Sequence, residues 1–161
     1  MMINGFRNFA LVLALFVLTE CCEAQELMPL DEYVKLNPEQ IPSVQLYTYD
    51  RCSAMILGLI YAQKLYRYKA LNFEHLMNEG YVAFTVLTIE SIKNNTSDPE
   101  SASKQEIAHM ENVTRRYDEH LAKIIASGKE VEKDKLLIAD NRVCMKFLKA
   151  YEDQEQKRNN R

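Results

Sequence analysis

The chain has 161 residues, with 20 Lys and Arg against 23 Asp and Glu, and its formal net charge is −3 at pH 7. Acidic and basic residues are interspersed along the chain, which argues against nucleic-acid binding because that function needs clustered positive charge. The chain has only four glycines, too few and too scattered to form a glycine-rich phosphate loop.

The N-terminus has the features of a secretory signal peptide. Arg7 provides a positive charge before the unbroken apolar run 9–18. Ala24 and Cys22 place small residues at the −1 and −3 positions of a cleavage before Gln25. We therefore expect export to the periplasm or the extracellular space.

Two alternatives to a cleaved signal peptide remain open. One is an uncleaved membrane anchor, although the apolar run is shorter than the roughly 20 residues that span a bilayer. The other is a lipoprotein signal acylated at Cys21 or Cys22, although Glu20 stands where processing favours a small residue. Removal of residues 1–24 would leave a chain of net charge −2, long enough for one domain with a core. We expect no stable membrane span in this mature chain.

The distribution of proline and glycine predicts how the mature chain is organised. Three of the four prolines fall within residues 25–42, which we interpret as an extended N-terminal arm with room for one helical turn at 38–40. Proline and glycine then almost disappear until Pro99, which argues against an all-β domain. We predict a helical bundle domain over residues 43–151 and a solvated tail over 152–161.

Apolar residues at helical spacing predict four helices. They run from near Ser43 to Lys69, from after Asn72 to near Asn94, from Pro99 to just before Gly128, and from about Asp134 to Tyr151. In the third helix, Asp98 is a favourable N-cap residue, Pro99 suits the first turn, and Gly128 suits the C′ position. The inward residues expected for this helix are Ile107, Met110, Tyr117, Leu121 and Ile124. Four helices with short connections predict an all-α four-helix bundle, up-down-up-down or a close relative.

The two cysteines of the mature chain are expected to form a disulfide bond. Cys52 and Cys144 lie on the apolar stripes of the first and fourth helices, which are neighbours in a simple four-helix ring. A pair of cysteines in an exported chain is more often a disulfide than a metal site or a nucleophile. The alternative is two unpaired buried cysteines that pack as small apolar side chains.

The only motif that suggests a metal is Glu106-x-x-His109, a spacing found in di-iron carboxylate bundles. Such a site also needs a second Glu-x-x-His motif, and neither His75 nor His120 has an acid three residues before it. His109 and His120 would lie roughly 16 Å apart along their helix, too far to share a metal. We therefore expect no metal or cofactor and, because no catalytic motif is found, no enzymatic activity.

Tyrosine is frequent in this chain, with nine residues, whereas tryptophan is absent. One face of the first helix, opposite Cys52, carries a band of large side chains. We call it the tyrosine band, and it comprises Tyr47, Leu57, Tyr61, Leu65 and Tyr68. Tyrosine is enriched at interfaces because its ring buries area while its hydroxyl still finds a partner. The tyrosine band is therefore a candidate partner-binding surface, unless a neighbouring helix or the N-terminal arm covers it.

The leading functional hypothesis is an exported, non-enzymatic helical protein that acts through contact with a protein partner that the sequence does not identify. The alternative is a carrier of a small apolar ligand, with a cavity among tyrosines and the methionines Met55, Met77 and Met110. A metal-dependent enzyme using Glu106 and His109 is the least favoured hypothesis. The sequence leaves open the oligomeric state and the glycosylation of its Asn-x-Ser/Thr sequons.

Overall fold

The structure, a computed structural model, describes residues 27–38, 41–67 and 71–160, and the predicted signal peptide lies outside these ranges. All regular elements in the described ranges are helical, which confirms the predicted all-α class. Five are α-helices: α2 (Leu30–Leu36), α3 (Ile41–Tyr66), α4 (Tyr81–Asn95), α5 (Pro99–Ala126) and α6 (Lys135–Asn159). Three are short turns: the 3-10 turns η2 (Leu71–Phe73) and η4 (Val131–Lys133), and the π-helical turn η3 (Leu76–Gly80).

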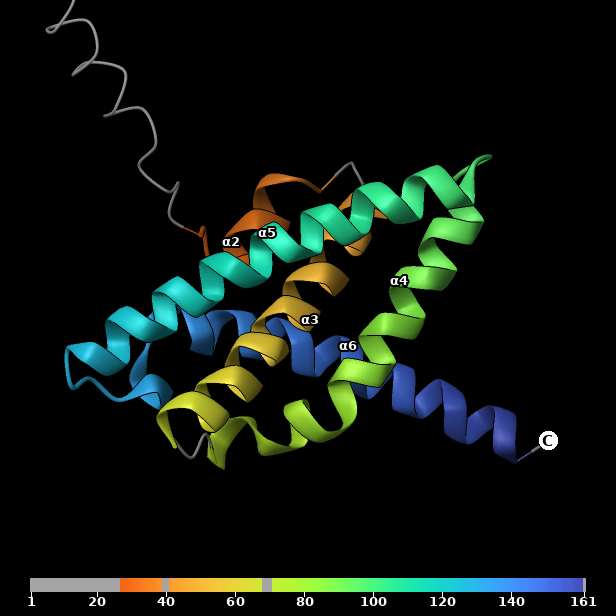
Figure 1. The fold of residues 1–161 in the computed structure, drawn as a ribbon. Helices are drawn as coiled ribbons and strands as arrows, with labels where there is room; N and C mark the ends of the chain where they lie inside the picture. Colours follow the sequence, from red (N-terminus) through yellow and green to blue (C-terminus); the bar gives the residue numbers. More distant parts are fainter. Residues whose placement is uncertain (1–26, 39–40, 68–70, 161) are drawn as a thin grey trace, which may run out of the picture.

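Helix α3 is the central helix, and α2, α4, α5 and α6 all pack against it (Figure 1). Every residue from 48 to 56 is buried, so this stretch of α3 is surrounded on all sides. A helix that is enclosed in this way must bury whatever side chains it carries, whether polar or apolar. As a result Asp50 and Arg51 are buried along with Cys52.

A close contact between α3 and α5 depends on Gly58. A Cβ atom at this position would lie 3.1 Å from the Cβ of Tyr117 and 3.2 Å from Cδ1 of Leu121. These distances are shorter than most van der Waals contacts between carbon atoms. The small residue thus allows the two helix backbones to approach.

The predicted ends of α5 are confirmed. The side chain of Asp98 accepts a hydrogen bond from the backbone N–H of Ser101 at 3.2 Å, and Pro99 is the first helical residue. At the other end Gly128 has a φ of +68°, and its N–H donates to the carbonyl of Ile125. Glycine adopts this left-handed conformation without steric penalty, so Gly128 ends the helix.

The prediction of an extended arm over residues 25–42 was wrong, because α2 forms within it. Pro29 stands immediately before α2, where its missing N–H and fixed φ do not oppose a helix. Leu30, the first residue of α2, is fully buried against the rest of the fold. The helical turn expected at 38–40 falls largely on residues outside the described ranges.

Two further boundaries differ from the prediction. Helix α6 continues to Asn159 instead of ending at Tyr151, although most side chains of its last turns are exposed as predicted. The second predicted helix begins irregularly, through η2 and η3, before α4. Ile107, expected in the core, is 54% exposed because it lies at the rim of an open pocket between α3, α4 and α5 instead of inside the core.

Candidate functional site

The tyrosine band is divided by the structure into a covered part and an exposed part. The ring of Tyr47 lies 4.2 Å, centroid to centroid, from that of Tyr33, so α2 covers this end of the band. Leu57 is half-buried, whereas Tyr61 and Leu65 are 46% and 73% exposed. Tyr68 lies outside the described residues. Both alternatives that the sequence left open therefore apply, each to a different end of α3.

The exposed end borders a surface depression between α3 and α5, which we call the α3–α5 hollow. It has a volume of about 290 Å³, and its lining residues are Gly58, Tyr61, Ala62, Leu65, Tyr66, Asp118 and Leu121. Burial and the neighbouring Glu119 raise the pKa of the Asp118 carboxyl above its ordinary value. The hollow thus combines apolar and aromatic walls with one partly desolvated acid.

Sequence reasoning missed two residues of this hollow. Tyr66 shares the inward face of α3 with Cys52 by helical spacing, but it is 49% exposed because it is the last residue of the helix. Asp118 lies next to the buried Tyr117 on α5 and has no feature in the sequence that separates it from other surface acids. Only the pairing of α3 with α5 brings them together.

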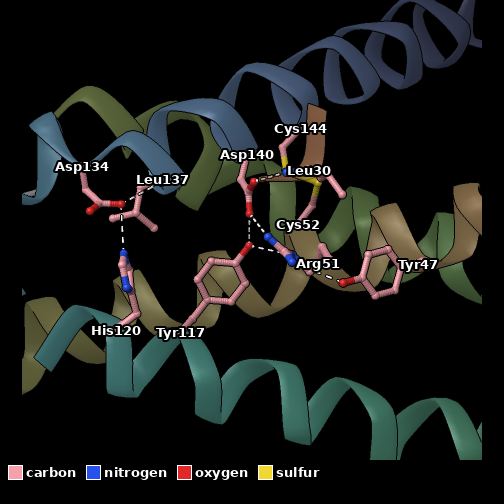
Figure 2. A network of polar contacts seen from close by, with 10 residues as sticks. All are labelled: Leu30, Tyr47, Arg51, Cys52, Tyr117, His120, Asp134, Leu137, Asp140 and Cys144. Carbon is pink, nitrogen blue, oxygen red and sulfur yellow. Dashed lines mark hydrogen bonds and ion pairs between the residues drawn. A yellow bond between two sulfur atoms is a disulfide. The ribbon is translucent and has the colours of Figure 1, made fainter. Parts of the chain in front are cut away.

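A second cluster, which we call the polar core, lies inside the protein and joins four helices (Figure 2). Arg51 of α3 forms an ion pair with Asp140 of α6, and both side chains are almost completely buried. The Arg51 Nε–H also donates to the Tyr117 hydroxyl at 2.9 Å, and that hydroxyl donates to Asp140 Oδ2. The other carboxylate oxygen accepts from the backbone N–H of Leu30 at 2.6 Å, so Asp140 also caps α2.

The charges in the polar core stabilise one another. Burial acts to lower the pKa of Arg51, but Tyr117 and Asp140 outweigh this effect and raise it. Burial, together with the charge of Asp140, raises the pKa of Tyr117 well above its ordinary value. Arg51 therefore stays cationic and Tyr117 stays a neutral hydroxyl at physiological pH. Because its members are enclosed and paired with one another, we assign the polar core a structural role.

The predicted disulfide bond is confirmed, and it lies beside the polar core (Figure 2). The Cα atoms of Cys52 and Cys144 are 5.6 Å apart, and both residues are fully buried. Cys52 directly follows Arg51, and Cys144 follows Asp140 by one helical turn. The disulfide bond and the ion pair therefore join α3 to α6 at the same level.

The residues of the Glu-x-x-His motif do not gather further metal ligands. Glu106 is half-buried, and burial raises the pKa of its carboxyl. His109 is exposed, with its ring 5.7 Å from that of Tyr47, and burial and Arg116 lower its pKa. His120 instead contacts Asp134 at 3.0 Å. Among the described residues no group of three or more His, Cys, Asp or Glu is placed to hold a metal ion; the expectation of no metal remains a prediction.

Comparisons with known proteins assign no family to this chain. No protein-family model matches the sequence, and neither the curated proteins nor the solved structures include a significant match. In the part of the chain that the structure describes, no helix combines the length and apolar character needed to cross a membrane. The function of this protein must therefore be inferred from its own residues.

Proposed function

We propose that this protein is exported and, without being an enzyme, binds a partner protein through the α3–α5 hollow and the exposed side chains around it. The observation that carries the proposal is the exposure of Tyr61, Leu65 and Tyr66 together at the end of one helix. Large apolar and aromatic side chains that gather beside a depression are typical of contact sites. The N-terminal signal features support export.

The chemistry of the hollow favours one kind of partner. Its aromatic and aliphatic walls suit an apolar side chain of the partner, inserted between α3 and α5. Asp118 offers a carboxylate beside that position, and a partly desolvated carboxylate is stabilised by a nearby cation. We therefore propose a partner that presents an apolar residue flanked by Lys or Arg.

The fold holds this surface in a defined position. Gly58 and Leu121, which line the hollow, belong to the tight contact between α3 and α5. The polar core and the disulfide bond lie nearer the start of α3 than the hollow does, and they fix the contacts of α3 with α5 and α6. A preorganised surface loses less conformational freedom on binding, and this increases affinity.

Site-specific photo-crosslinking in the organism of origin tests the proposal. A photoreactive amino acid at Leu65, which is 73% exposed, should give a specific adduct with one protein. The same amino acid at Leu36, which is 62% exposed on α2, is the matched control and should not give that adduct. Adducts that are identical from both positions, or absent from both, would contradict the proposal.

The partner identified in this way allows a quantitative prediction. Replacement Tyr61→Ala should weaken its binding by about 1–3 kcal/mol, because an aromatic anchor is lost from the interface. The melting temperature should change little, since the Tyr61 side chain is already about half in solvent in the free protein. Isothermal titration calorimetry measures the affinity, with Leu36→Ala as the matched surface change. An affinity that is the same for Tyr61→Ala and the wild type would exclude Tyr61 from the interface.

A further inference from the structure

A separate pocket lies between α3, α4 and α5. Helices α4 and α5 meet at their connection and diverge away from it (Figure 1), and the pocket has a volume of about 250 Å³. Its apolar wall includes Ile89 and Ile92 from α4, and Ile107 and Met110 from α5. This volume is slightly below the roughly 300 Å³ at which small-molecule sites usually begin, so it suits a small ligand.

One residue that lines this pocket is a buried carboxylate with an unpaired oxygen. Asp50 of α3 is fully buried, and its Oδ1 accepts a long hydrogen bond of 3.4 Å from Thr88. Its Oδ2 accepts no hydrogen bond from any residue that the structure describes. The other buried carboxylate, Asp140, receives three hydrogen bonds from the protein. Because burial of an unpaired carboxylate is strongly unfavourable, we expect Asp50 to pair with a positively charged or hydrogen-bond-donating group.

The remaining polar residues of the pocket specify the charge of that partner. Glu106 is the second acid, and burial raises the pKa of its carboxyl. Among the described residues that line the pocket there is no Lys, Arg or His. The other polar lining residues carry hydroxyl groups: Ser53, Tyr81, Thr85, Thr88 and Ser103. Carboxylate and hydroxyl oxygens accept hydrogen bonds from an ammonium group, which has three donors and no acceptor.

We propose that this pocket binds a small organic ammonium ion, with its charged nitrogen next to Asp50 and its apolar body between α4 and α5. The two acids disfavour anions, and the volume of the pocket favours an amine that carries a short aliphatic or aromatic group. Met110 belongs to this pocket, whereas Met55 and Met77, considered with it in the sequence, belong to the hydrophobic core. The pocket is distinct from the α3–α5 hollow, since Asp50 and Tyr61 lie roughly 16 Å apart along α3.

Calorimetric titration of the disulfide-bonded protein with 2-phenylethylamine tests this proposal. The neutral analogue 2-phenylethanol has nearly the same shape and serves as the comparison. The protonated amine is expected to bind at a ratio of one to one with a Kd below about 1 mM. The alcohol should bind at least about tenfold more weakly, because it lacks the charge that pairs with Asp50. Absence of amine binding at about 10 mM, or equal binding of both compounds, would overturn the proposal.

Two variants test whether the amine binds in this pocket. Asp50→Asn keeps the shape of the side chain and should weaken amine binding at least about tenfold while leaving the alcohol unaffected. Ile107→Trp places a larger ring at the half-exposed rim and should abolish binding of the amine, without loss of folding because Ile107 is 54% exposed. Ile138→Trp, at an exposed position on α6, is the matched control and should bind normally. If Asp50→Asn does not fold, the Ile107→Trp variant alone tests the position of the amine. Amine binding that is retained in Ile107→Trp would show that the amine binds elsewhere and would refute the assignment.

Discussion

Replacing Asp140 by Asn should lower the free energy of unfolding by about 3–5 kcal/mol. The side chain keeps its shape but loses its charge, so the guanidinium of Arg51 stays buried without an anionic partner. The amide nitrogen of Asn cannot accept a hydrogen bond, so the variant could keep only one of the two that Asp140 now accepts, from the Tyr117 hydroxyl at Oδ2 and from the Leu30 N–H at Oδ1. Urea denaturation followed by circular dichroism measures the change, with the disulfide bond intact in both proteins.

The same substitution at a surface ion pair provides the control. Asp31, partly exposed on α2, lies 3.8 Å from the exposed Lys35, and Asp31→Asn should change the stability by less than about 1 kcal/mol. A double variant, Arg51→Met with Asp140→Leu, should recover much of the loss because it removes both buried charges. If Asp140→Asn were no more destabilising than Asp31→Asn, the polar core would not be a major source of stability.

The sequence predicted the elements whose signals are local. The Asp98 cap, the left-handed Gly128 and the inward positions of Cys52 and Cys144 each follow from a residue type at a particular helical position. These features depend on one helix at a time, or on a pair of helices that is adjacent in any simple bundle. The all-α class follows from the same local patterns.

The sequence did not predict the features that depend on how completely α3 is surrounded. A helix with two apolar faces indicates deep burial, but its pattern does not show that Asp50 and Arg51 are enclosed as well. Two partners of Arg51, Tyr117 and Asp140, lie on other helices at separations of 66 and 89 residues, which no local spacing reveals. The placement of α2 was missed for the same reason, because the residue that holds its first turn is Asp140.

The candidate site was predicted in part. Tyr61 and Leu65 do lie on an exposed surface, whereas Tyr47 of the same band is covered by α2. Helical periodicity correctly places these side chains on one face, but it gives no information about which neighbour covers each turn of that face. The pocket at Asp50 was beyond prediction, because it is formed where α4 and α5 diverge.

Removal of the disulfide bond by Cys52→Ala together with Cys144→Ala should lower the free energy of unfolding by about 4–5 kcal/mol. The bond joins residues 92 positions apart, and a cross-link that closes a long loop strongly restricts the unfolded chain. Changing both cysteines avoids a buried free thiol and any exchange with other thiols. Urea denaturation of the double variant gives the change, and the wild type under reducing conditions should show a similar loss.

The native structure around the polar core should be unchanged when the disulfide bond is removed. If the disulfide bond acts mainly on the unfolded chain, the double Ala variant should retain the hydrogen bonds of the polar core. The NMR resonances of the Leu30 amide and of the Arg51 Nε–H, which donate to Asp140 and Tyr117, should then keep their wild-type positions and their slow hydrogen exchange relative to exposed amides. The Asp140→Asn variant should instead shift both resonances, because it changes the native state directly. Equal shifts in the two variants would show that the disulfide bond also holds α3 and α6 in the position that the ion pair requires.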